Sequence, residues 1–285
     1  MITWNHLPLP TQSDHPDGQI IELLRKQTHF IAKGNGPPLV LIHGYFYDNH
    51  MWDQNITELS KHFTVYAIDL WGSGLSCRGD LDYSYNLFVT QLKLFLNHLN
   101  LNKVSLCGQG MGAGLIMHFA SLYPQSVDKM ILVDSAGLPD SIPFTAKLMQ
   151  VTWIALSLFK IPGTWVRLKI LHKHFMKNTY TMSPMILERI LHFHQIQGTS
   201  ESLLKMLKAK FFHSLKDSID SLTKLNIPAL IIWGEDDNSN PLSQGEKLQK
   251  LLPNSTLTVI PKAGHVSNTD EPQLFNQVAL EFLLK

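Results

Sequence analysis

The chain has 285 residues, an apolar content of 44% and a formal net charge of +1 at pH 7. This length suits one large α/β domain or a core with an inserted subdomain, and the balanced charge argues against a nucleic-acid partner. The two cysteines, Cys77 and Cys107, lack metal-ligand spacing, and the N-terminus lacks the basic start and apolar run of a signal peptide. We therefore expect a reducing, cytoplasmic location and no transmembrane segment.

The first part of the chain predicts an extended arm followed by strands. Residues 1–17 have little periodicity, whereas 19–24 and 28–32 are expected to form two strands. A continuous apolar run at 39–42 is typical of a fully buried parallel strand, and it ends at His43.

Strands and helices are then expected to alternate up to residue 137. We expect loop and helix over 48–60, a buried strand over 63–70 and a helix capped by Ser84. A strand begins at Val104, a helix follows it up to Tyr123, and residues 129–133 form the next strand.

The alternation of strands and helices stops over residues 138–215, where the pattern is helical. It resumes with a strand over 227–234. A helix over 243–252, a strand over 256–260 and a helix over 271–284 complete the chain. We predict an α/β fold with a mostly parallel sheet and helices on both faces. Residues 1–137 and 216–285 form its core, and 138–215 form an inserted helical cap.

The stretch between the strand at Val104 and its helix carries a glycine cluster, Gly108-Gln109-Gly110-Met111-Gly112. Its frame fits the nucleophile elbow G-x-S-x-G, a sharp strand-to-helix turn, but Gly110 stands where the serine belongs. The alternative is a glycine-rich dinucleotide loop. Ala113 falls where the third glycine of that motif belongs, and no acidic residue ends a following strand at the required distance.

Five short motifs in order give the chain its resemblance to the α/β-hydrolase fold family, and within it to capped esterases and carbon–carbon bond hydrolases. They are His43-Gly44, Asp69-Leu70-Trp71-Gly72-Ser73-Gly74-Leu75-Ser76, the glycine cluster, Trp233-Gly234-Glu235-Asp236-Asp237 with Pro241, and Ala263-Gly264-His265. The resemblance covers about 33–137 and 216–285, and each motif follows an expected strand. The order of nucleophile, acid and histidine is also that of the family.

The resemblance implies a role for each motif. His265 takes the nucleophile's proton, and a carboxylate orients its imidazole. Asp237 has the family's spacing to Pro241, with Asp236 and Asp134 as alternative acids. The backbone N–H groups of Met111 and of Tyr45, with Phe46 as alternative to Tyr45, form the oxyanion hole.

Two further features of the sequence can be interpreted either as structural or as functional. Asp69 and Ser76 brace a loop rather than take part in catalysis. The uncharged run 148–159 is a cap helix packed on the core, or else an apolar lid or a face that contacts a membrane surface. An apolar lid suits a hydrophobic small-molecule substrate. We expect no cofactor and no metal, and the sequence does not define the oligomeric state.

Gly110 leaves three hypotheses open. The chain is a hydrolase whose serine was replaced to trap substrate or silence activity, which the retained Asp237 and His265 favour. It is a natural ligand-binding member of the fold without turnover. Or it is a lyase-like enzyme in which His265 and Asp237 act as a base dyad and need no serine.

Overall fold

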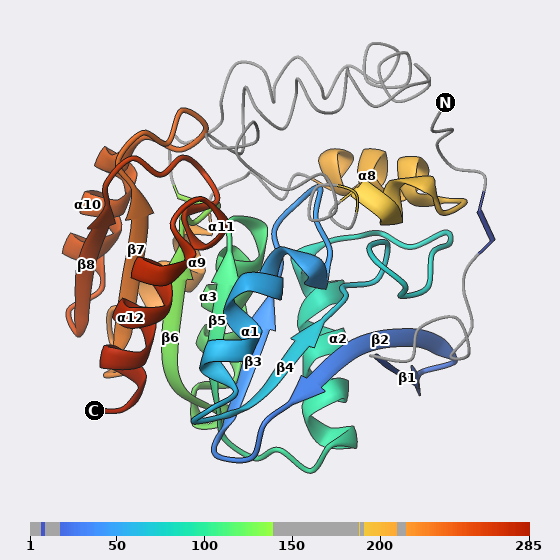
Figure 1. The fold of residues 1–285 in the computed structure, drawn as a ribbon, viewed down its shortest axis with the longest axis horizontal. Helices are drawn as coiled ribbons and strands as arrows, with labels where there is room; N and C mark the ends of the chain where they lie inside the picture. Colours follow the sequence, from blue (N-terminus) through green and yellow to red (C-terminus); the bar gives the residue numbers. More distant parts are fainter. Residues whose placement is uncertain (1–6, 9–17, 139–187, 189–190, 210–214) are drawn as a thin grey trace.

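A computed structural model describes residues 7–8, 18–138, 188, 191–209 and 215–285 (Figure 1). Within these residues one sheet contains eight strands in the order β1-β2-β4-β3-β5-β6-β7-β8. The strands are β1 Gln19–Leu23, β2 Lys26–Lys33, β3 Pro38–Ile42, β4 Thr64–Ile68, β5 Val104–Gln109, β6 Val127–Val133, β7 Ala229–Gly234 and β8 Ser255–Ile260.

The sheet is parallel from β4 to β8 and antiparallel only where β2 pairs with β1 and with β4. Every residue of β5 and of β7 is buried, as are four of the five residues of β3. Such strands are covered on both faces, which explains the continuous apolar runs in the sequences of β3 and β7. The expected mostly parallel α/β architecture is therefore confirmed.

Helices lie on both faces of this sheet. The α-helices are α1 Asp53–Leu59, α2 Tyr85–His98, α3 Met111–Leu122, α8 Thr199–Lys208, α9 Lys216–Leu222, α10 Leu242–Leu251, α11 Ser267–Asp270 and α12 Pro272–Leu283, and the 3-10 helices are η2 Asn49–Trp52, η3 Pro124–Ser126 and η4 Phe193–Gln195. Helices α1 and α12 pack together on the near face in Figure 1, whereas α3 contacts both α2 and α9. The predicted cap at Ser84 is present, because its hydroxyl accepts from the N–H of Leu87.

Much of the segment expected to form the cap, including the apolar run 148–159, lies outside the described residues. Its described part contains η4 and α8, and α8 lies beyond the ends toward which β3 and β4 point (Figure 1). Two backbone hydrogen bonds join Leu7 to this part, at Gln195 and Gln197. No helix in the described part of the chain is long and apolar enough to cross a membrane.

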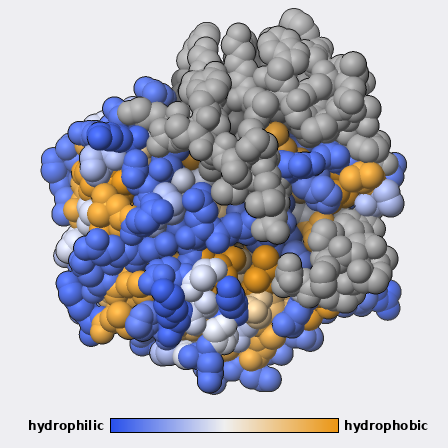
Figure 2. All heavy atoms as spheres, in the orientation of Figure 1, coloured by the Kyte–Doolittle hydropathy of each residue, from blue (hydrophilic) through white to orange (hydrophobic). Residues whose placement is uncertain are grey.

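The surface visible in Figure 2 is largely hydrophilic. Its orange hydrophobic areas are small and separated by hydrophilic residues. Among the described residues, the buried apolar side chains form a hydrophobic core packed against the sheet.

Candidate active site

The turn between β5 and α3 has the geometry of a sharp elbow. Gly110 lies between the two elements with φ 53° and ψ −111°, in a region that residues with a Cβ rarely adopt. A Cβ on Gly108 would lie 2.6 Å from the carbonyl carbon and oxygen of Gly112. A Cβ on Gly112 would overlap the carbonyl oxygen of Ile42. The two outer glycines therefore allow β5, α3 and the end of β3 to approach closely.

Gly110, in contrast, has room for a side chain. A Cβ built there would lie 3.5 Å from His265 Nε2 and 4.0 Å from His265 Cε1, which are ordinary contact distances. Apart from its chain neighbours Gln109 and Met111, no other described residue has an atom within 4 Å of that position. A side chain at position 110 would therefore project toward the imidazole of His265.

His265 is held by a buried carboxylate. Its Nδ1 lies 2.8 Å from Asp237 Oδ2, and the Asp237 side chain is fully buried. The other Asp237 oxygen accepts the backbone N–H groups of Ser239 and Asn240 at 2.7 and 2.9 Å. Because these donors occupy Oδ1, the carboxylate keeps Oδ2 directed at His265.

The pKa of His265 reflects opposing effects. Burial alone would lower it, but the charge and hydrogen bond of Asp237, with the charges of Asp134 and Asp270, raise it above its usual value. Asp270 also accepts the N–H of Gly264 at 2.8 Å, which holds the turn that presents His265. The imidazole therefore combines a fixed orientation with enhanced basicity, as a general base requires.

The two alternative acids take other positions. Asp236 is exposed, so of the neighbouring pair only Asp237 points inward. Asp134 is fully buried, and its oxygens accept the Gly234 N–H at 2.8 Å and the Ser267 hydroxyl at 2.8 Å. Burial, together with the charge of Asp237, raises the pKa of Asp134 to about 7. Asp134 thus joins the end of β7, just before the acid, to α11, just after the histidine.

The loop after β3 lies against the elbow. A Cβ on Gly44 would overlap Gln109 Oε1, so the loop that continues into Tyr45 contacts the residue before Gly110. Met111 begins α3, and N–H groups in the first turn of a helix have no partner within it. The structure therefore places the backbone of both expected oxyanion donors beside the same turn.

Contacts from the described part of the expected cap segment hold this loop. Phe46 has φ 75°, which is strained for a residue with a side chain. Its carbonyl lies 3.2 Å from His194 Nε2, and the two rings lie 4.2 Å apart. The hydroxyl of Tyr45 donates to the Leu203 carbonyl at 3.2 Å. Residues of η4 and α8 therefore fix the conformation of the loop.

His43 supports the same loop from the opposite side. Its Nε2 accepts the Leu70 N–H at 3.0 Å, and its Nδ1 donates to the Gly44 carbonyl at 2.8 Å. Both roles require a neutral imidazole, and burial lowers the pKa of His43 accordingly. His43 therefore ties the end of β3 to the end of β4.

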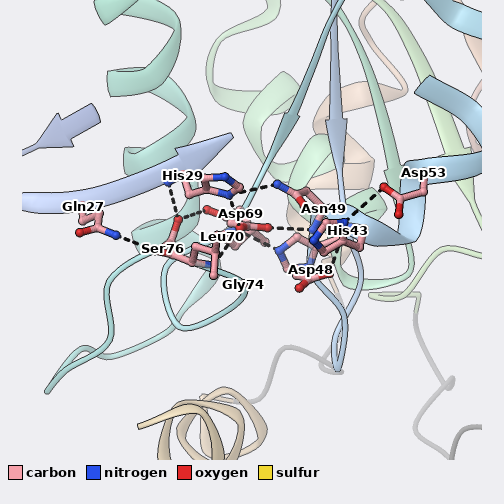
Figure 3. A network of polar contacts seen from close by, with 12 residues as sticks. Gln27, His29, His43, Asp48, Asn49, Asp53, Asp69, Leu70, Gly74 and Ser76 are labelled. Carbon is pink, nitrogen blue, oxygen red and sulfur yellow. Dashed lines mark hydrogen bonds and ion pairs between the residues drawn. The ribbon is translucent and has the colours of Figure 1, made fainter. Parts of the chain in front are cut away.

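Asp69 is the centre of a bracing network at the end of β4 (Figure 3). Its carboxylate accepts the backbone N–H groups of Asn49 and Leu75 and lies 2.7 Å from His29 Nδ1. Ser76 donates to the Asp69 carbonyl at 2.6 Å. These contacts hold the loops that follow β3 and β4, which agrees with the bracing role expected for Asp69 and Ser76.

Two residues of the site, Gln109 and His194, were not anticipated from sequence, and Asp134 was expected only as an alternative acid and not in the bracing role that it has. Gln109 donates to the His265 carbonyl at 2.6 Å, His194 contacts Phe46, and Asp134 joins the acid loop to the histidine loop. The position of Gln109 inside the elbow frame was the one available signal. The partners of the other two lie about one hundred residues or more away in sequence. The described segments hold no group of three or more His, Cys, Asp or Glu arranged to bind a metal.

Comparisons with known proteins show which family the chain resembles in sequence and in fold. Residues 39–278 match the sequence model of the alpha/beta hydrolase family. A 2-hydroxy-6-oxo-6-(2'-aminophenyl)hexa-2,4-dienoic acid hydrolase from Metapseudomonas resinovorans is 25% identical over 273 residues, covering 90% of this chain and 87% of that protein.

Two solved structures are similar throughout. A meta-cleavage product hydrolase from Pseudomonas fluorescens IP01, a serine-to-alanine mutant complexed with acetates, has a TM-score of 0.81 at 25% identity. A malate-bound thermophilic esterase from Thermogutta terrifontis has a TM-score of 0.78 at 26% identity. Each match covers 93% of this chain and 97% of the other.

Proposed function

The chain belongs to the alpha/beta hydrolase family, and from that premise we propose that its site takes a hydrophobic small-molecule ester or carbon–carbon bond substrate. Gly110 occupies the nucleophile position, Asp237 and His265 are the acid and the base, and Tyr45 and Met111 donate to the oxyanion. Without a hydroxyl at position 110 the chain makes no acyl-enzyme, so this is a form of the hydrolase without its nucleophile.

One observation supports this proposal above the others. The Cβ position of residue 110 lies 3.5 Å from His265 Nε2, and the opposite ring nitrogen is paired with Asp237. A serine hydroxyl extends one bond beyond that Cβ and would come within reach of the imidazole. An ordinary glycine turn would have no reason to face a buried histidine–carboxylate pair in this way.

The substrate class rests on the relatives and on the expected cap. The relatives include a hydrolase of a dienoic acid and an esterase, whose substrates both offer a carbonyl carbon for attack. Residues 138–215 form the cap in this proposal, and its uncharged run 148–159 covers the substrate as an apolar lid. The protein acts in the cytoplasm on this account, because Cys77 and Cys107 are both free thiols, as is typical of proteins in a reducing compartment.

The test is the variant Gly110→Ser. On a panel of activated esters and vinylogous keto acids we expect it to gain hydrolysis that the parent chain lacks. The gain disappears in Gly110→Ser combined with His265→Ala, because nucleophile and base act as a unit. If Gly110→Ser folds normally and hydrolyses no member of the panel, the proposal fails.

A ligand-binding protein without turnover is the second candidate. The observation that favours it is the elbow itself, because Gly108 and Gly112 maintain the site without any side chain at 110. Mass spectrometry of small molecules that co-purify with the protein would support it, provided that Gly110→Ser leaves them intact. The gene's codon at position 110 separates a substituted serine from a natural glycine.

A further inference from the structure

Gln109 precedes Gly110 at the end of β5, and its side chain contacts two other parts of the site. We propose that Gln109 is a positioning residue for the reaction, whose amide group holds the backbone of His265 in place relative to the loop after β3. The inference rests on the proposed function and adds to it a residue that acts through the base and through this loop.

The first contact is with the base. Gln109 is 1% exposed, and its Nε2 donates to the His265 carbonyl at 2.6 Å, although the two residues lie 156 positions apart in sequence. Asp237 bonds to the imidazole and so determines how the ring is turned. Gln109 bonds to the backbone that carries the ring, so it determines where the ring is placed. The two contacts are therefore complementary, and neither replaces the other.

The second contact is with the loop after β3. A Cβ on Gly44 would lie 1.9 Å from Gln109 Oε1 and 3.2 Å from the amide carbon. The amide group therefore lies against Gly44 and leaves no room for a larger residue there. The next residue is Tyr45, whose N–H is an expected oxyanion donor. The amide group that bonds to His265 thus also limits how closely this loop approaches the base.

The backbone of Gln109 is held by the sheet. Gln109 pairs with Val133 where β5 runs beside β6, and the Gly110 N–H donates to the Val133 carbonyl at 2.9 Å. The side chain therefore extends from a fixed point toward two irregular segments, and it relates the nucleophile position to the base and to the oxyanion donor. A displacement of about 1 Å among such groups can lower a rate about a hundredfold.

The experiment measures kcat on an activated ester in the Gly110→Ser background. Gln109→Ala removes both contacts and should lower kcat at least about tenfold with KM unchanged. Gln109→Glu keeps the size of the side chain but places a carboxyl group opposite the His265 carbonyl. When protonated this carboxyl donates as the amide does, and when ionised it only accepts. The ratio of its kcat to that of Gly110→Ser should therefore rise as pH falls.

Gln91→Glu is the matched control for a carboxyl group introduced in the interior. Gln91 is as deeply buried, and its Nε2 donates to the Asp69 carbonyl at 3.0 Å rather than to His265. Its kcat ratio should stay constant with pH under conditions in which circular dichroism shows the variant folded. Loss of stability alone would not produce the recovery expected for Gln109→Glu.

Gly44→Ala tests the second contact, because the new methyl group would displace Gln109 Oε1. Gly44→Ala and Gln109→Ala should each lower kcat, and the combined variant should be no slower than the slower of the two, because both disturb the same contact. Independent effects would instead multiply. Gly79→Ala should leave kcat unchanged, since a Cβ there would meet no described atom within 4 Å.

The inference would be overturned by a kcat of Gln109→Ala equal to that of Gly110→Ser, by a Gln109→Glu ratio that varies no more than that of Gln91→Glu, or by multiplying effects of Gly44→Ala and Gln109→Ala. The proposed function would survive these results, since it fails only if Gly110→Ser hydrolyses no member of the panel. In that event the parent chain decides the inference. The imidazole resonance that His265→Ala removes from the NMR spectrum should shift in Gln109→Ala, and an unshifted resonance would overturn the role of Gln109.

Discussion

Alanine substitutions at the glycines of the elbow should have unequal effects on stability. In Gly112→Ala the new methyl group overlaps the Ile42 carbonyl oxygen and comes within 2.7 Å of the His43 carbonyl oxygen, and both atoms belong to backbone that cannot rotate away. Overpacking of this kind costs about 3 kcal/mol at the upper end of its usual range. Replacing a helical glycine with alanine returns about 1 kcal/mol. The expected net loss is therefore about 2 kcal/mol.

In Gly110→Ala the methyl group meets only His265 at 3.5 Å, so the cost comes from the backbone. Holding a residue with a Cβ in this sparsely populated backbone conformation costs about 1–3 kcal/mol. Reduced freedom of the unfolded chain returns about 0.4–1 kcal/mol. We expect a net loss of about 1 kcal/mol, half that of Gly112→Ala.

Urea unfolding followed by circular dichroism measures both losses. Gly79→Ala is the control, because a Cβ there would meet no described atom within 4 Å, and its stability should stay within about 0.5 kcal/mol of the parent. The account of the elbow would be refuted if Gly110→Ala lost as much stability as Gly112→Ala, or if Gly112→Ala behaved like Gly79→Ala.

Three further predictions concern the surroundings of the site. In the folded protein Asp134 keeps its proton up to about pH 7, whereas in the unfolded chain it loses the proton near pH 4. Between these two pH values the folded state binds more protons than the unfolded state, so the free energy of unfolding falls as pH rises. Asp134→Asn should make this fall smaller, as measured by urea midpoints from pH 4 to 8. In the Gly110→Ser background, His194→Phe keeps an aromatic ring but removes the hydrogen bond to the Phe46 carbonyl. We expect kcat to fall by up to about tenfold with KM unchanged. An unchanged kcat would contradict the role of His194 in positioning the loop at Phe46. Burial raises the pKa of the Cys77 thiol to about 11 and also raises the pKa of the fully buried Cys107 thiol. Peptide mass spectrometry should therefore find that iodoacetamide at pH 8 labels Cys77 slowly and Cys107 only after unfolding.

Much of the sheet could be predicted because buried parallel strands have a simple signature. Residues 39–42 form an unbroken apolar run, residues 104–107 are apolar except for Ser105, and the structure places the two segments side by side in β3 and β5. The last helix was expected over 271–284 and is found as α12 at 272–283, but the short α11 before it was missed. Four residues with no apolar periodicity carry no signal for a helix.

The candidate site could be predicted only where chemistry and local spacing coincide. Asp236 and Asp237 are adjacent and chemically identical. The spacing to Pro241 favours Asp237 as the acid, and the structure distinguishes the two by burial, because Asp237 is buried and Asp236 is exposed. His194 has no local feature that distinguishes it from the other histidines. Its role depends on Phe46, 148 positions away, and such contacts are set by tertiary packing.

The most direct test of the account is covalent labelling of Gly110→Ser with a serine-directed phosphonate, read by intact mass and peptide mapping. Position 110 is the nucleophile position on this account, so the variant should take up one phosphonyl group per chain at the introduced serine, and the parent chain none. Adding His265→Ala should slow the labelling by several orders of magnitude, because the hydroxyl loses its base. A well-folded Gly110→Ser that takes up no phosphonate, or a parent chain labelled at another residue, would contradict the assignment of Gly110.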